Sequence, residues 1–176
     1  MRPELRRLLW ALAAVFAVHE AEEWNLVTWL QAHFTPEPGF TDLGARTLLV
    51  LFASLAVSFT VLAVRFLSER AAVVALAPLF LSVVLGNALT HIFWCIYFRG
   101  YAPGVITSLA LIPLALAFAR LALREHLAPR VYVWVLLALS LLQPMAAALA
   151  GSHLSAQQIA LQAWGNRLAL WLWGAV

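Results

Sequence analysis

A histidine and a run of acidic residues interrupt an otherwise apolar stretch, residues 8–30, near the start of the chain. His19, Glu22 and Glu23 lie three and four residues apart in this stretch. Residues with that spacing share one face of an α-helix. Imidazole nitrogens and carboxylate oxygens on one face are suitable ligands for zinc, iron or manganese. The cluster therefore predicts a metal site, with Glu20 expected on a different face of the helix.

A second polar pair lies in a later apolar stretch and has the spacing of one helix face. Asn87 and His91 are four residues apart. At a rise of ~1.5 Å per residue, Glu23 and His91 both lie ~10 Å from the outer ends of their helices, and His19 and Asn87 both lie ~17 Å from them. We therefore expect the two stretches to bring their polar residues together at one depth.

The matching depths predict a centre for a divalent metal: iron, zinc or manganese. Its expected ligands are His19, Glu22, Glu23 and His91. The residues expected to act in catalysis are Glu22, Glu23 and Asn87. The side chains expected to line a substrate cavity beside the metal are Trp24, Phe93, Trp94 and Gln143.

Buried acidic residues of this kind favour a functional role. A charged carboxylate at the centre of a bilayer costs about 2.5–3.5 kcal/mol on insertion scales, so ionisable residues inside a span usually mark a working site. The leading hypothesis is a metal-dependent membrane enzyme that acts on an apolar or lipid-like substrate. The alternative is a metal-free isomerase or cyclase of isoprenoid-like substrates, in which the glutamates transfer protons. A third reading is a proton or cation conduit, which requires a homo-oligomer.

The elements that must position these residues are membrane-spanning helices. Hydrophobic residues make up 64% of the chain and charged residues 11%, too few charges for the surface of a soluble domain. We expect one all-α domain, residues 1–176, that forms a polytopic bundle of about five transmembrane helices. Their expected ranges are 8–30, 47–66, 74–98, 105–123 and 131–150. A further helix, about 155–175, mixes glutamine with tryptophan and is expected to be interfacial or partly inserted.

The basic residues predict the orientation in the bilayer. All eleven are arginines, and they lie scattered at the ends of apolar stretches, which argues against a nucleic-acid partner. Eight of them fall on the side of the N terminus: Arg2, Arg6, Arg7, Arg65, Arg70, Arg120, Arg124 and Arg130. Basic residues collect on the cytoplasmic side. The sequence therefore predicts a bacterial inner-membrane protein with a cytoplasmic N terminus.

Three short motifs together resemble those of a known family. They are His19-x-x-Glu22-Glu23 in the first stretch, Asn87-x-x-x-His91 in the third, and the turn Tyr101-x-Pro103-Gly104. This combination resembles the HXXEE family of small bacterial integral membrane proteins. The resemblance implies that these residues form a site, and it names no reaction.

Overall fold

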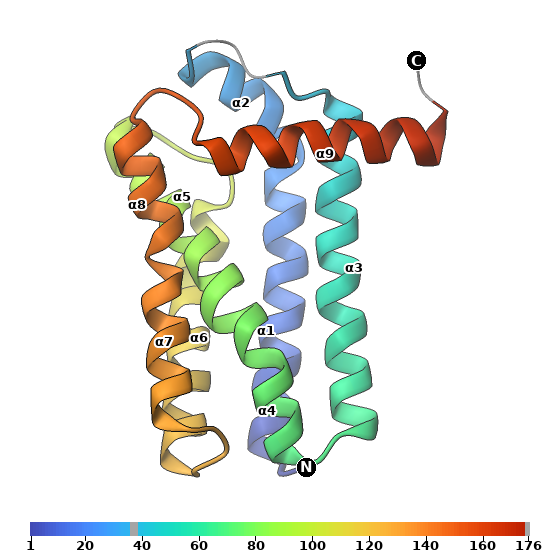
Figure 1. Ribbon diagram of the computed structural model, residues 1–176, viewed down its shortest axis with the longest axis vertical. Coiled ribbons are helices and arrows are strands. Elements are labelled where there is room, and N and C mark those ends of the chain that lie inside the picture. Colours follow the sequence, from blue (N-terminus) through green and yellow to red (C-terminus); the bar gives the residue numbers. More distant parts are fainter. Residues whose placement is uncertain (36–38, 175–176) are drawn as a thin grey trace.

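The computed structural model describes residues 1–35 and 39–174, and the regular elements in this part of the chain are all helices. The elements are α1 (Pro3–Glu22), η1 (Glu23–Asn25), α2 (Leu26–His33), α3 (Asp42–Phe66), α4 (Glu69–Ala77), η2 (Pro78–Val84), α5 (Leu85–Tyr97), α6 (Val105–Arg124), α7 (Arg130–Ser140), α8 (Leu142–Ala150) and α9 (Ala156–Trp173). Figure 1 shows α1, α3, α6 and the α7–α8 pair running roughly along the long axis of the molecule. The predicted all-α, polytopic bundle is confirmed.

Four helical stretches are long and apolar enough to cross a membrane. They are Asp42–Phe66, Glu69–Tyr97, Val105–Arg124 and Arg130–Ala150, and they correspond to the second to fifth predicted spans. The chain is therefore an integral membrane protein by the length and composition of its helices. Helix α1 falls outside this group because charged residues lie near both its ends. Its role as a fifth span stays a prediction, although it runs beside α3 in the bundle (Figure 1).

One buried stripe of α1 runs the length of the helix and becomes polar near its end. Leu5, Leu9, Leu12 and Phe16 are all buried at spacings of three and four residues, the pattern of a helix face packed in a core. The same stripe continues through Glu20 and Glu23. Helix α1 packs against α3 on one side and α6 on the other. The polar cluster therefore replaces a section of the hydrophobic core.

The third predicted span is one continuous helical stretch with a wider turn in its middle. Pro78 begins a π-helical segment, η2, between α4 and α5. Proline has no amide hydrogen and removes one hydrogen bond of an α-helix, which favours such an irregularity. A second interruption separates α7 from α8, close to Pro144. Leu79 of η2 and Gln143, near the start of α8, line the cavity described below.

Helix α9 lies across the end of the bundle that is opposite the N terminus (Figure 1). It begins with a capping box formed by Ser155 and Gln158. The Asn166 side chain accepts a hydrogen bond from the Thr41 hydroxyl at 2.9 Å and donates to the Gly39 carbonyl at 2.7 Å. These contacts attach α9 to the start of α3. It corresponds to the helix predicted at 155–175, of which residue 175 lies outside the described residues.

Candidate metal centre

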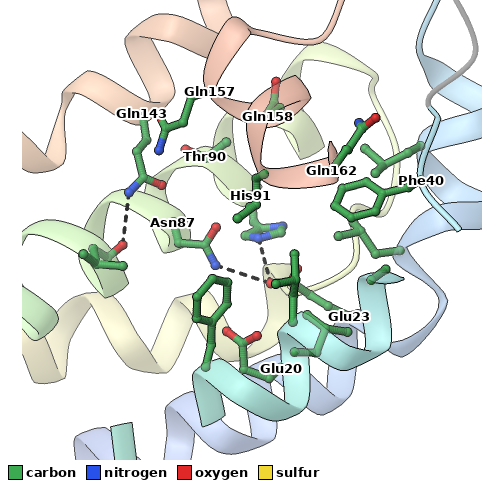
Figure 2. A pocket seen from close by; sticks show the side chains of 18 of the residues that line it. Glu20, Glu23, Phe40, Asn87, Thr90, His91, Gln143, Gln157, Gln158 and Gln162 are labelled. Carbon is green, nitrogen blue, oxygen red and sulfur yellow. Dashed lines mark hydrogen bonds and ion pairs between the residues drawn. The ribbon is translucent and has the colours of Figure 1, made fainter. Parts of the chain in front are cut away.

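Three buried side chains from α1, η1 and α5 meet at one point. Glu23 Oε1 lies 2.8 Å from Nε2 of His19 and 3.0 Å from Nε2 of His91. The three side chains offer ligand atoms that all lie within 4.8 Å of one another. Figure 2 shows the His91 ring directed at the Glu23 carboxylate. Ligands bound at ~2.0–2.2 Å from a metal lie about 3 Å apart, so this group matches the spacing of a metal site.

The buried His91 ring has Glu23 as its close polar neighbour. Neither nitrogen of His91 has a hydrogen-bond partner among the described residues, although Glu23 lies close. A buried carboxylate needs compensating positive charge, because removing an ion from water is costly. A cation shared by the carboxylate and the two imidazoles would supply that charge.

A chain of hydrogen bonds on the other side of the His19 ring selects which ring nitrogen carries the hydrogen. His19 Nδ1 lies 2.8 Å from the Thr107 hydroxyl oxygen, and that hydroxyl lies 2.6 Å from a carboxylate oxygen of Glu22. Because the hydroxyl donates its hydrogen to Glu22, it accepts one from His19 Nδ1. The Nε2 atom of a neutral His19 is then an acceptor that lies 2.8 Å from Glu23 Oε1. A metal ion or a proton between these two acceptors would stabilise their close approach.

Glu22 is bound at the N terminus of α6, away from Glu23. Its carboxylate accepts hydrogen bonds from the backbone amides of Ile106 (3.1 Å) and Thr107 (2.9 Å) and from the Tyr101 hydroxyl (2.9 Å). A helix N terminus favours an anion through its free amides and its dipole. Partial burial, followed by the hydrogen bond to Glu22, raises the pKa of Tyr101 to about 12. The phenol therefore stays protonated, and continues to donate, at physiological pH.

The turn before α6 closes one side of the centre. The Val105 amide donates to the Ala102 carbonyl at 3.0 Å, and Gly104 has φ +88°. Proline and glycine occupy the two central positions of this turn, as a type II turn favours. A Cβ atom on Gly104 would lie 2.7 Å from Cε1 of His19 and 3.1 Å from the ring of His91. Backbone thus packs directly against both imidazoles.

His19 and Glu23 belong to the motif His19-x-x-Glu22-Glu23, which is also the defining motif of a known protein family. The family model described as "Protein of unknown function with HXXEE motif" matches residues 10–118, more than half of the chain. The chain belongs to the HXXEE family. No curated protein and no solved structure matches it.

The three defining residues of the HXXEE motif have different surroundings. His19 lies at the centre, in contact with groups on both sides of its ring. Glu23 contacts the two imidazoles, whereas Glu22, which we expected to be a fourth ligand, contacts Thr107 and the start of α6. The candidate metal group is therefore His19, Glu23 and His91. Among the described residues, Glu22 is linked to the metal group through the Thr107 hydroxyl.

Asn87 lies beside the HXXEE residues, as its spacing from His91 predicted. Its amide nitrogen is 2.9 Å from His19 Nε2 and 3.4 Å from Glu23 Oε1. Gln143 is farther away and donates to the Val83 carbonyl at 3.4 Å. Both amides line a cavity of about 440 Å³ that reaches the metal group. Figure 2 shows this cavity with both side chains.

Two of the four residues predicted to line the cavity do so in the structure. Trp94 and Gln143 line it, whereas Trp24 and Phe93 are not among the described lining residues. Trp24 is exposed, and the Arg46 guanidinium carbon lies over its ring, 5.2 Å from the ring centre. Phe93 stacks on Tyr97 at 5.5 Å.

Three further residues belong to the site and were missed from the sequence: Glu20, Thr107 and Gln162. Glu20 was expected on another face, yet it is buried and points into the cavity beside Glu23 (Figure 2). It lies one helical turn before Glu23, which the pattern could have indicated. Thr107 carried little signal, because threonine is common near helix starts. Gln162 was one of several glutamines in its segment.

Replacement of Thr107 by valine is expected to weaken metal binding by ~10–100-fold, the usual effect of removing the group that orients a metal-bound histidine. Valine keeps the shape of threonine and leaves His19 Nδ1 without its acceptor. The measurement is a titration of the purified protein with Zn²⁺ against a competing chelator. Ser108→Ala is the matched control, since the Ser108 hydroxyl donates to the Gly104 carbonyl at 2.7 Å and has no other hydrogen bond among the described residues. Equal Zn²⁺ affinities in the two variants would contradict the role of the Thr107 hydroxyl in orienting His19.

Proposed function

We propose that this protein is a metal-dependent membrane enzyme that acts on an apolar or lipid-like substrate. The observation that carries the proposal is the convergence of two buried imidazole nitrogens on one buried carboxylate oxygen, at 2.8 and 3.0 Å. His19, Glu23 and His91 are the proposed ligands. Two histidines and one carboxylate are a ligand set that binds zinc or iron in enzymes and leaves positions open for water or substrate.

Such a centre would act as a Lewis acid or would lower the pKa of a bound water. The chain's own residues would orient the reaction. Thr107 and Glu22 hold the His19 ring with Nε2 toward the metal, and Asn87 supplies an amide beside Glu23. Glu20, in the same cavity, is a carboxylate free to exchange a proton with a bound molecule. Iron, zinc and manganese all suit these donors.

Elemental analysis of the purified protein tests the proposal. We expect stoichiometric zinc, iron or manganese in the wild-type protein and a loss of at least nine-tenths of it in His91→Ala. His91→Ala is expected to remain folded with reduced stability, because it removes one ring that is 1% exposed and leaves the rest of the core unchanged. Circular dichroism and gel filtration in detergent check the fold. A folded wild-type protein that neither contains nor takes up a divalent metal would refute the metal centre.

The second candidate is a metal-free acid–base enzyme of isoprenoid-like substrates. It is supported by Glu20, a carboxylate that is 4% exposed and lines the cavity together with Glu23. Buried carboxylates can donate and accept protons in apolar surroundings. In this reading a proton, and not a metal ion, lies between His19 and Glu23. The same elemental analysis separates the two candidates.

The orientation and assembly in the membrane are proposed from the sequence. The excess of arginine on one side favours a cytoplasmic N terminus in a bacterial inner membrane, with α9 at the outer interface. Reporter fusions to the two termini test this, and a reporter that places residue 1 outside would refute it. A conduit for protons or cations would require a homo-oligomer, and a monomeric mass in detergent would weigh against that third reading.

A further inference from the structure

The cavity beside the candidate metal centre has both polar and apolar lining residues. Glu23, His91 and Gln162 form a polar end of its lining. Most of the other lining residues are apolar, among them Phe16 and Phe59. A volume of about 440 Å³ is within the range of ~300–1,000 Å³ typical of sites for small molecules. An amphiphile with one hydrocarbon chain has this distribution of polarity and this size.

Two buried donors in the cavity wall have no acceptor among the described residues. Trp94 Nε1 and Gln162 Nε2 are both without a hydrogen-bond partner, and each residue is 6% exposed. They come from α5 and α9, and both residues line the cavity. An unpaired buried donor costs about 1–3 kcal/mol, so proteins nearly always satisfy such groups. The two donors indicate a ligand that brings an acceptor oxygen to the polar end.

Some of the apolar lining residues are exposed on the side of the bundle. Leu55 and Phe59 of α3 and Val83 of η2 line the cavity, and they are 38%, 51% and 49% exposed. They lie on two membrane-spanning stretches, at positions that face the hydrocarbon of a bilayer. An opening between α3 and η2 would therefore admit a molecule sideways from the lipid, with its chain trailing into the bilayer.

The charges of the lining residues restrict the headgroup. Glu20 and Glu23 are acidic, and the described lining residues include no arginine or lysine. Arginine is the usual partner of phosphate and carboxylate groups. If a divalent metal is bound as proposed above, the two glutamates balance its charge. The headgroup that fits best is therefore uncharged.

We propose that the cavity binds a single-chain lipid with an uncharged oxygen headgroup, a hydroxyl or a carbonyl, that enters from the bilayer between α3 and η2. The headgroup oxygen accepts hydrogen bonds from Trp94 and Gln162 beside the metal centre, and the chain lies along Phe16, Phe52 and Leu55. The proposal deepens the proposed function by naming its substrate class, and its choice of an uncharged headgroup rests on the metal centre.

Photolabelling in phospholipid vesicles tests the site. The probes are a long-chain alcohol, the corresponding fatty acid and the corresponding alkyl phosphate, each with the same photoreactive diazirine in its chain. We expect the alcohol to label cavity residues at least five-fold more than either anionic probe, as measured by mass spectrometry of peptides. Gln162→Leu and Trp94→Phe should each reduce this labelling several-fold, because each removes one donor and retains an apolar side chain.

The lateral opening is tested by a matched pair of substitutions on α3. Leu55→Trp would fill the opening and should reduce labelling by the alcohol at least five-fold. Leu62→Trp places the same side chain two turns away at an exposed position outside the described cavity lining, and should leave labelling unchanged. Equal labelling in both variants, or equal labelling by all three probes, would overturn the lipid site.

Metal content, measured on the same samples, separates this inference from the proposed function. Protein that carries metal but fails both labelling tests would overturn the lipid site and leave the metal centre standing. Protein that lacks metal, yet labels selectively with the alcohol and loses labelling in Leu55→Trp, would overturn the metal centre and support the lipid site.

Discussion

Glu23→Gln is expected to abolish stoichiometric metal binding, lowering the affinity for Zn²⁺ by more than ~100-fold. The carboxylate is the single anionic group in the candidate metal group and contacts both imidazoles, at 2.8 and 3.0 Å. Removal of this ligand should therefore reduce the affinity more than removal of a group that only orients a ligand, which typically costs ~10–100-fold. The measurement is titration with Zn²⁺ in detergent against a competing chelator.

The two neighbouring glutamates are the matched controls for this prediction. Glu22→Gln should weaken binding by ~10–100-fold, because Glu22 acts on His19 only through Thr107. Glu20→Gln should retain metal close to the wild-type level, since Glu20 lines the cavity but is not part of the candidate metal group. If Glu20→Gln loses as much metal as Glu23→Gln, Glu20 is itself a ligand and the assignment of the three carboxyl groups is wrong.

Gly104→Ala is expected to disrupt both the turn and the metal centre. The positive φ of +88° is strained for alanine, at a cost of ~1–3 kcal/mol. The added Cβ atom would lie 2.7 Å from Cε1 of His19 and 3.1 Å from the His91 ring. Because these rings are almost fully buried, they can give way only by leaving their positions around Glu23. We expect a lower thermal midpoint and metal binding weakened at least ten-fold.

Gly100→Ala, in the same loop, is the control for Gly104→Ala. A Cβ atom at Gly100 would be 3.8 Å from the nearest atom, the Phe98 carbonyl oxygen, an ordinary contact. This variant should keep the wild-type midpoint and metal affinity. Thermal denaturation in detergent and the Zn²⁺ titration measure both properties. A Gly104→Ala protein that behaves like Gly100→Ala would show that the turn does not support the centre.

Helical geometry predicted part of the site and misassigned another part. His19 and Glu23 share a face at ~100° per residue, as do Asn87 and His91, and all four meet in the structure. Glu20, however, differs from Glu23 by ~300°, which equals ~60° in the other direction. Glu20 and Glu23 are thus closer around the helix than Glu22 and Glu23, which are ~100° apart. The structure accordingly directs Glu20 to the cavity and Glu22 to α6.

The sequence by itself determined the class of fold and indicated several residues of the candidate site. Long apolar stretches can satisfy their backbone in a membrane only as helices or closed barrels, and their lengths here suit helices. Two histidines and a glutamate inside such helices require a shared partner, because isolated charges are costly there. These constraints are local, so they can be read from residue type and spacing.

Only the tertiary structure decided what each polar group contacts and what surrounds the centre. Glu22 binds the amides at the start of α6, a segment more than eighty residues away that no spacing rule links to it. Gln162 reaches the cavity because α9 crosses over α3, where Gly165 allows close approach to Leu48. Helix packing depends on the shapes of whole surfaces and not on the period of one helix. The cavity, and the two donors in its wall that have no partner among the described residues, therefore arise only when distant segments come together.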